Sequence, residues 1–264
     1  MVELFKSITK KEWKFWIKVL LALLFLTSLS RIFVFINMPE DSVWSGRTYF
    51  APVDRYVYVS YIEQVRSGAY LLEDLYTSKE ESVPMLNVFW TSLGLIARLT
   101  GASANFVLEF SRIALIPLLL FVLYLFLKLL IDNFFQRKLT FLLAVFGGGL
   151  GVWIYPLLEP FFRGKELVDH LPIDFTFAES FIFLTSYYSA HFIFSTTLFI
   201  AILLLSLLAL KKNKLHYGIY SGLLALILAN FHPFAFVSLC FILFVYLGYL
   251  FWQDRSRALF FLKY

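Results

Sequence analysis

The feature that most constrains this chain is the length of its uncharged apolar runs. Residues 215–253 contain no Asp, Glu, Lys or Arg over 39 positions, and residues 180–210 contain none over 31. As single helices these runs would measure about 58 Å and about 46 Å, whereas the hydrocarbon core of a bilayer is about 30 Å thick. Each run must therefore turn. The polar breaks lie at residues 189–191 (Ser-Ala-His) and 230–233 (Asn-Phe-His-Pro).

The composition excludes a soluble domain. Of the 264 residues, 60% are apolar and 16% are charged, whereas typical globular domains have roughly 45–50% and about 25%. Aromatic residues reach 20%, as the interfacial belts of membrane proteins require. The single cysteine, Cys240, excludes a disulfide framework or a cysteine metal site. A net charge of +5, carried by scattered residues, does not indicate a nucleic-acid binder.

We therefore predict an all-α polytopic membrane protein with about six transmembrane helices. The expected spans are residues 18–37, 106–131, 139–158, 192–210, 215–229 and 234–252. The first span follows a lysine-rich segment without a small-residue cleavage site, so it is interpreted as an uncleaved signal anchor. A short helix is expected before the fourth span.

Charge sets the predicted orientation. The segments expected inside hold 13 Lys and Arg against 4 Asp and Glu, and those expected outside hold 7 against 13. Because Lys and Arg are retained on the cytoplasmic side, both termini are predicted to be cytoplasmic. The polar segments long enough to build a site then lie on the outer face of the plasma (inner) membrane.

The first outer loop, residues 38–105, is too long for a simple connection. Residues 54–67 have apolar side chains at helical spacing and are followed by Gly68, a typical helix stop. Residues 84–99 are apolar but too short to span, which favours a helix lying in the interface. The prediction is one membrane domain over residues 1–264, into which this extracytoplasmic loop is inserted.

The order of these elements resembles a known family. The loop helix is followed by VPMLNVFWTSLGLIARLTG, by a span that opens with Glu-Phe-Ser-Arg and ends in Gln-Arg-Lys, and by AESFIFLTSYYSAHF and ANFHPF. Over roughly residues 15–240 the chain is similar to the GT-C superfamily of membrane glycosyltransferases, in particular to the family 39-like enzymes that use polyprenyl-phosphate sugars. Those enzymes usually have more than six spans, and residues 258–264 (ALFFLKY) read like the start of another, so C-terminal truncation stays open.

The resemblance implies that an outer-loop carboxylate acts as general base on the acceptor hydroxyl. Asp54 occupies that position relative to Gly68. The alternative interpretation, compatible with the first, is that Asp54 is the N-cap of the loop helix. The family often has two adjacent acidic residues here, whereas this chain has Asp54-Arg55. A second carboxylate would have to come from Asp41 or Glu179.

An anionic leaving phosphate needs cations or hydrogen-bond donors. Arg112 in the second span is the first candidate, because a charge within a span is costly and indicates function. Snorkelling, as for Lys128, or a helical pair with Glu109 is the alternative. Arg31 in the first span is a similar candidate. Two histidines at the breaks, His191 and His232, either bind substrate or satisfy broken backbone groups.

The resulting hypothesis is a glycosyltransferase that moves a sugar from a polyprenyl-phosphate donor to an unidentified acceptor outside the membrane. A transporter or flippase component is the first alternative, because broken helices often line transport sites. A catalytically silent scaffold of the same architecture is the second. The sequence requires no cofactor, and no spacing of ligands supports a divalent metal, although Asp41, Asp54 and Glu179 can converge in space.

Overall fold

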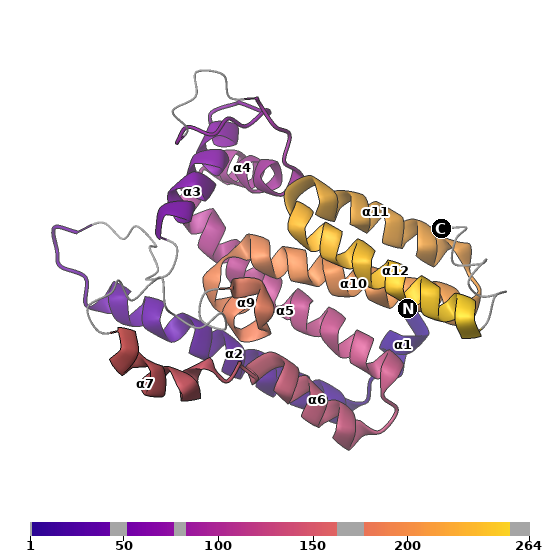
Figure 1. Cartoon of the computed structure of the whole chain (residues 1–264). Coiled ribbons are helices and arrows are strands. Elements are labelled where there is room, and N and C mark those ends of the chain that lie inside the picture. Colours follow the sequence, from indigo (N-terminus) through magenta and orange to yellow (C-terminus); the bar gives the residue numbers. More distant parts are fainter. Residues whose placement is uncertain (1, 43–51, 77–82, 163–176, 254–264) are drawn as a thin grey trace.

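The computed structural model describes residues 2–42, 52–76, 83–162 and 177–253, and these ranges are mostly helical (Figure 1). The one β pairing within them is an isolated bridge between Leu72 and Met85. Four helices are long and apolar enough to cross a membrane: α2 (Lys10–Ile36), α5 (Ala104–Leu130), α10 (Ala190–Lys212) and α12 (Pro233–Gln253). The chain is a helical membrane protein, as its composition predicts.

Both predicted breaks in the long apolar runs are confirmed. The first run divides at Ser189, between α9 (Ile182–Tyr188) and α10. The second divides at His232, between α11 (Leu215–Phe231) and α12. With 17 residues, α11 is an apolar helix at the short end of the range that spans a bilayer.

The expected single helix over residues 139–158 is wrong. This stretch contains the end of α6 (Phe134–Phe146) and most of α7 (Gly151–Phe162). At about 20 Å and about 18 Å, neither helix crosses the hydrocarbon core alone. The glycines at 147–149 account for the break, because each glycine in a helix interior costs about 1 kcal/mol relative to alanine.

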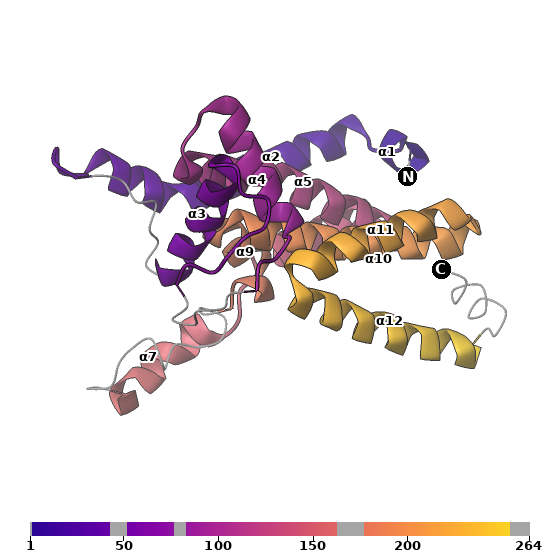
Figure 2. The same cartoon turned by 90° about the horizontal axis from the view of Figure 1, so that it is seen from above.

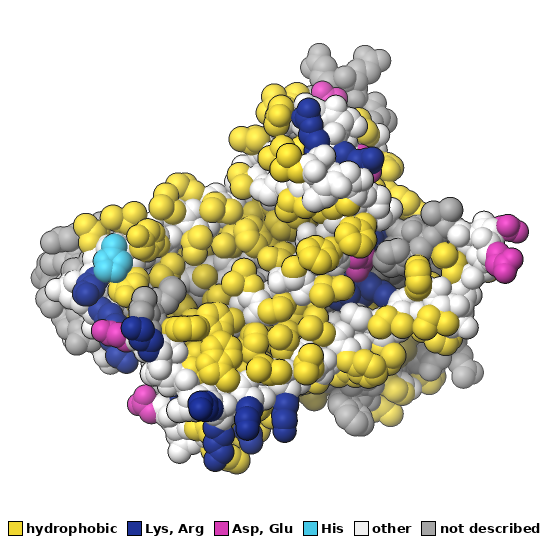
Figure 3. Space-filling model, turned by 180° about the vertical axis from the view of Figure 1, so that it is seen from behind, with side chains coloured by type: hydrophobic (Ala, Val, Ile, Leu, Met, Phe, Trp, Pro, Cys, Tyr) yellow, Lys and Arg dark blue, Asp and Glu magenta, His cyan; other side chains and the backbone are white. Residues whose placement is uncertain are grey.

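The helices define two ends of the molecule (Figure 1). The basic end contains α1 (Val2–Lys6), the start of α2 and the last turns of α5, α10 and α12. The loop end contains α3 (Pro52–Arg66), α4 (Val88–Thr100), η2 (Ala178–Ser180) and α9. Viewed from behind, Lys and Arg side chains gather at the lower left margin and a broad hydrophobic area covers the centre (Figure 3).

At the loop end, α3 and α4 pack against each other and onto α5. The predicted loop helix is confirmed as α3, and Gly68 follows it with a positive φ of 110°. Gly94 of α4 lies so close to α3 that an added Cβ would be 2.3 Å from Cβ of Val65. Asn230 connects this pair to α11, because its side chain accepts from Val88 N–H (2.7 Å) and donates to the carbonyl of Leu86 (2.9 Å).

At the basic end, a buried carboxylate joins three helices. One Glu12 oxygen accepts from Lys128 (2.7 Å), Arg137 (2.5 Å) and the hydroxyl of Tyr124 (2.8 Å). Lys128, in the last turn of α5, also donates to the carbonyl of Ser7 (3.1 Å), so its ammonium group is held by the N-terminal segment.

Candidate functional site

The first feature at the loop end is a set of three arginines around one carboxylate. Glu109 Oε1 lies 2.8 Å from Arg55 Nη1, and Glu109 Oε2 lies 3.0 Å from Arg112 Nε and 3.2 Å from Arg31 Nε. We call these four residues the arginine cluster. It joins α2, α3 and α5, which are far apart in the sequence.

The arginine cluster is buried. Arg112 is 1% exposed, and the side chains of the other three residues are about nine-tenths buried. Three guanidinium groups contact the same carboxylate. Buried charge is expensive unless it is paired. In addition, the buried Nε of Arg31 donates no hydrogen bond within the described part of the chain.

Two of these arginines also hold the end of α9. Arg112 donates to the carbonyl of Ser186 (3.1 Å), and Arg31 donates to those of Tyr187 (2.5 Å) and Tyr188 (3.2 Å). The last carbonyls of a helix lack intrahelical partners and favour cations. The arginine cluster therefore fixes the chain just before the break that begins α10.

The second feature, directly after that break, is a pair of buried histidines. The rings of His191 and His232 are 6.3 Å apart. His232 Nδ1 accepts from Ala235 N–H (3.4 Å), which leaves Nε2 to carry the ring proton toward Glu179 Oε1, 3.4 Å away. His191 Nδ1 lies 3.2 Å from the hydroxyl of Ser189. The contact with His232 lowers the pKa of Glu179 below its usual value.

Tyr58 of α3 completes the second group. Its ring stacks on Trp90 (4.8 Å) and meets His191 edge-on (4.5 Å). Burial raises the pKa of the Tyr58 phenol, and the carboxylates of Asp54 and Glu179 add to the effect. We call Tyr58, Glu179, His191 and His232 the histidine cluster.

The structure brings most of the candidate residues together. Glu179, His191 and His232 lie in the histidine cluster, and Arg31 and Arg112 lie in the arginine cluster. Asp54 lies one helical turn before Tyr58 on α3. The segment 186–191 links the two clusters, because Arg112 donates to the carbonyl of Ser186 and His191 belongs to the histidine cluster.

Two expectations about carboxylates need correction. Asp41 lies exposed in the turn after α2 and contacts neither cluster among the described residues. Asp54 is not the N-cap of its helix, because α3 begins two residues earlier, at Pro52. Asp54 is exposed and lies in the first turn, where a negative charge still favours the helix dipole.

The residues that sequence reasoning missed are Arg55 and the aromatic pair of Tyr58 and Trp90. Glu109 entered the prediction as a helical partner of Arg112 alone. Its place within a membrane span was the signal that it has a larger role, because carboxylates at that depth are rare and paired. No comparable signal points to Arg55.

The described residues contain no group of three His, Cys, Asp or Glu side chains placed to hold one metal ion. Comparison with known proteins finds no family model, curated protein or solved structure that matches this chain. The resemblance to the GT-C superfamily therefore stays a prediction.

Proposed function

We propose that the protein is a membrane glycosyltransferase that moves a sugar from a polyprenyl-phosphate donor to an acceptor hydroxyl at its loop end. The observation that carries the proposal is the arginine cluster, in which three buried guanidinium groups contact one carboxylate at the end of the membrane-spanning helices. Guanidinium groups bind phosphate through paired, charge-assisted hydrogen bonds. A lipid phosphate supplies negative charge at this depth.

The proposed orientation puts the loop end outside the plasma membrane and both termini in the cytoplasm. Because α5 and α10 both begin at the loop end and finish at the basic end, the chain returns once between them, and α6 supports that return. We propose six crossings, in which α6 and α7 together make the return and α11 is the short crossing. The lysine-rich segments then face the cytoplasm.

An apolar groove beside the arginine cluster suits the lipid chain of the donor. The groove has a volume of about 580 Å³ and lies between α2 and α9. Its lining residues are Leu26, Leu29, Ser30, Phe33, Val34, Phe183 and Tyr187. The guanidinium of Arg31 lies over the Tyr187 ring, 4.8 Å from its centre. A polyprenyl chain in the groove would therefore bring its phosphate to Arg31.

The proposed reaction uses the carboxylates near Tyr58. Asp54 takes the proton of the acceptor hydroxyl, whose oxygen forms the new bond to the anomeric carbon of the sugar. The bond from that carbon to the phosphate oxygen breaks, and the phosphate leaves with the electron pair, stabilised by the arginine cluster. Glu179, oriented by His232, holds a further sugar hydroxyl.

A transporter or flippase component is the second candidate, because α9–α10 and α11–α12 are both broken. Discontinuous helices in transporters lie near the middle of the membrane. Here both breaks lie at one end and pack against α3 and α4. This placement favours the enzyme.

The experiment uses farnesyl phosphate as a short-chain probe and neutral farnesol as its control. The purified full chain should bind farnesyl phosphate and not farnesol. Asp54→Asn should retain this binding. In a turnover assay with a farnesyl-phosphate hexose as donor and a membrane extract as the source of acceptor, Asp54→Asn should release farnesyl phosphate about 10²–10⁴-fold more slowly, the usual contribution of a general base.

The matched control is Asp41→Asn, which removes a carboxylate outside both clusters and should leave turnover unchanged. Equal binding of farnesol and farnesyl phosphate would contradict the proposal. Turnover of Asp54→Asn within twofold of the unsubstituted protein would remove Asp54 from the reaction.

A further inference from the structure

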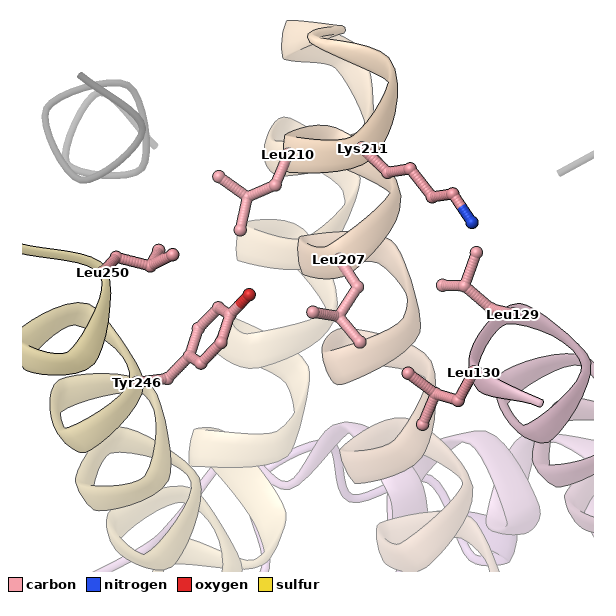
Figure 4. Close-up of a pocket in the computed structure, with 7 residues that line it drawn as sticks. All are labelled: Leu129, Leu130, Leu207, Leu210, Lys211, Tyr246 and Leu250. Atoms are coloured by element: carbon pink, nitrogen blue, oxygen red, sulfur yellow. The ribbon is translucent and has the colours of Figure 1, made fainter. Parts of the chain in front are cut away.

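A second groove lies at the basic end, far along the helices from the arginine and histidine clusters. It has a volume of about 460 Å³, within the range of about 300–1,000 Å³ typical of ligand pockets. Its lining residues come from α5, α10 and α12: Leu129, Leu130, Leu207, Leu210, Lys211, Tyr246 and Leu250 (Figure 4). We call it the basic-end groove.

The groove exists because α12 diverges from the rest of the bundle. The chain turns at His232 at the loop end, and from there α12 runs away from α10 and α11 toward its C-terminal end (Figure 2). Only Leu239 and Leu250 of α12 are buried. The space between α12 and the tightly packed α5 and α10 is therefore widest at the basic end.

The polar groups of the basic-end groove differ from its leucine walls. In Figure 4 the Tyr246 hydroxyl points toward α10, near Leu207 and Leu210, while Lys211 extends toward α5 beside Leu129. Lys211 is exposed and has no ion-pair partner within the described part of the chain. Its neighbour Lys212, in contrast, pairs with Glu3. The groove thus combines an apolar wall with an available cation at the membrane surface.

We propose that the basic-end groove binds one anionic phospholipid of the surrounding bilayer, with an acyl chain against the leucines and the phosphate on Lys211. Charge complementarity selects this occupant. Lys and Arg side chains gather at this end of the molecule (Figure 3), and basic pockets between membrane helices bind anionic headgroups. The inference does not depend on the glycosyltransferase proposal, since it uses no residue of the loop end.

The test is native mass spectrometry of the full chain released from micelles that contain equal amounts of phosphatidylglycerol and phosphatidylcholine. The unsubstituted protein should retain one phosphatidylglycerol. Lys211→Gln should lower that retention about fivefold, as expected for a lysine worth about 1 kcal/mol near an anionic surface. Lys214→Gln is the matched control, because Lys214 is exposed at the same end and does not line the groove.

A second variant tests the groove by shape instead of charge. Leu207→Trp fills the apolar wall and should lower retention of phosphatidylglycerol while Lys211 is kept. Equal loss in Lys211→Gln and Lys214→Gln, equal retention of the two lipids, or unchanged retention in Leu207→Trp would each overturn the proposal. A dimer that Leu207→Trp dissociates would also overturn it, since the occupant would then be a second copy of the chain.

Discussion

Glu109 holds the helices of the loop end together through its ion pairs. Its carboxylate holds guanidinium groups from α2, α3 and α5, and two of those groups hold the end of α9. Removing one partner of a buried ion pair costs more than the pair contributes, because the remaining charge stays buried. Here three cations would remain.

We predict that Glu109→Gln, which keeps the shape and removes the charge, destabilises the protein by about 3–5 kcal/mol. The matched control is Glu63→Gln. Glu63 pairs with Arg66 at 2.8 Å, but both side chains are about 40% exposed, and such pairs are worth about 0–1 kcal/mol. Unfolding by SDS titration in mixed micelles measures both variants. Equal midpoints for the two would show that the arginine cluster does not support the fold.

The contact between Glu179 and His232 predicts a dependence on pH. His232 lowers the pKa of Glu179 below the ordinary value of 4.5, so the carboxylate form stabilises the folded state. That contribution is present above pH 4.5 and is lost as pH falls through the lowered pKa. Because the Glu179 side chain is 41% exposed, the contribution is about 1 kcal/mol or less.

The unsubstituted protein should therefore have a higher thermal midpoint than Glu179→Gln at pH 6, and the difference should shrink toward zero as pH falls below 4. A difference that grows at low pH would have the wrong sign and would refute the pairing.

At the residue scale, the helix breaks beside His191 and at His232 were predictable, because polar residues interrupt long apolar runs there. Asp54 was named from the resemblance to the GT-C superfamily, and its role stays a prediction. Glu109, which forms an ion pair with Arg55, is 54 positions away, and a contact of that range depends on how α3 docks onto α5. A single sequence contains no signal for that docking.

At the scale of elements, glycines end one helix, interrupt an expected span and allow two helices to pack closely. Gly68 ends α3 through its positive φ, and a stop of this kind is predictable. The glycines at 147–149 lie between α6 and α7, in a stretch whose apolar pattern predicts a single span. Gly94 brings α4 against α3, and this packing role has no sequence signature.

Gly94→Ala should destabilise the protein by about 1–3 kcal/mol, the usual cost of overpacking. The added Cβ would meet Val65 Cβ at 2.3 Å and the carbonyl oxygen of Ile62 at 2.9 Å. Gly222→Ala is the control, since Gly222 lies within helix α11 and an added Cβ there meets nothing within 4 Å. It should be neutral or stabilise by up to about 1 kcal/mol. Thermal midpoints that rank the two variants in reverse would contradict the docking of α3 on α4.

At the scale of the whole molecule, two charged assemblies lie at opposite ends of the apolar helices. Glu12 joins α2, α5 and α6 at the basic end, and Glu109 joins α2, α3 and α5 at the loop end. The two differ in balance: the described partners of Glu12 are Lys128 and Arg137, whereas Glu109 has three arginines. The assembly with three arginines lies at the loop end, as does the histidine cluster.

The last prediction concerns which end faces the cytoplasm, on which the proposed reaction depends. Lysines favour the cytoplasmic side, so the basic end should be inside. In a background where the single cysteine Cys240 is replaced by serine, Glu73→Cys at the loop end should react with a membrane-impermeant maleimide in intact cells. Lys214→Cys at the basic end should react only after permeabilisation. Both positions are exposed, so burial does not confound the comparison. The reverse labelling would put the arginine and histidine clusters on the cytoplasmic face, where a donor presented from outside cannot reach them.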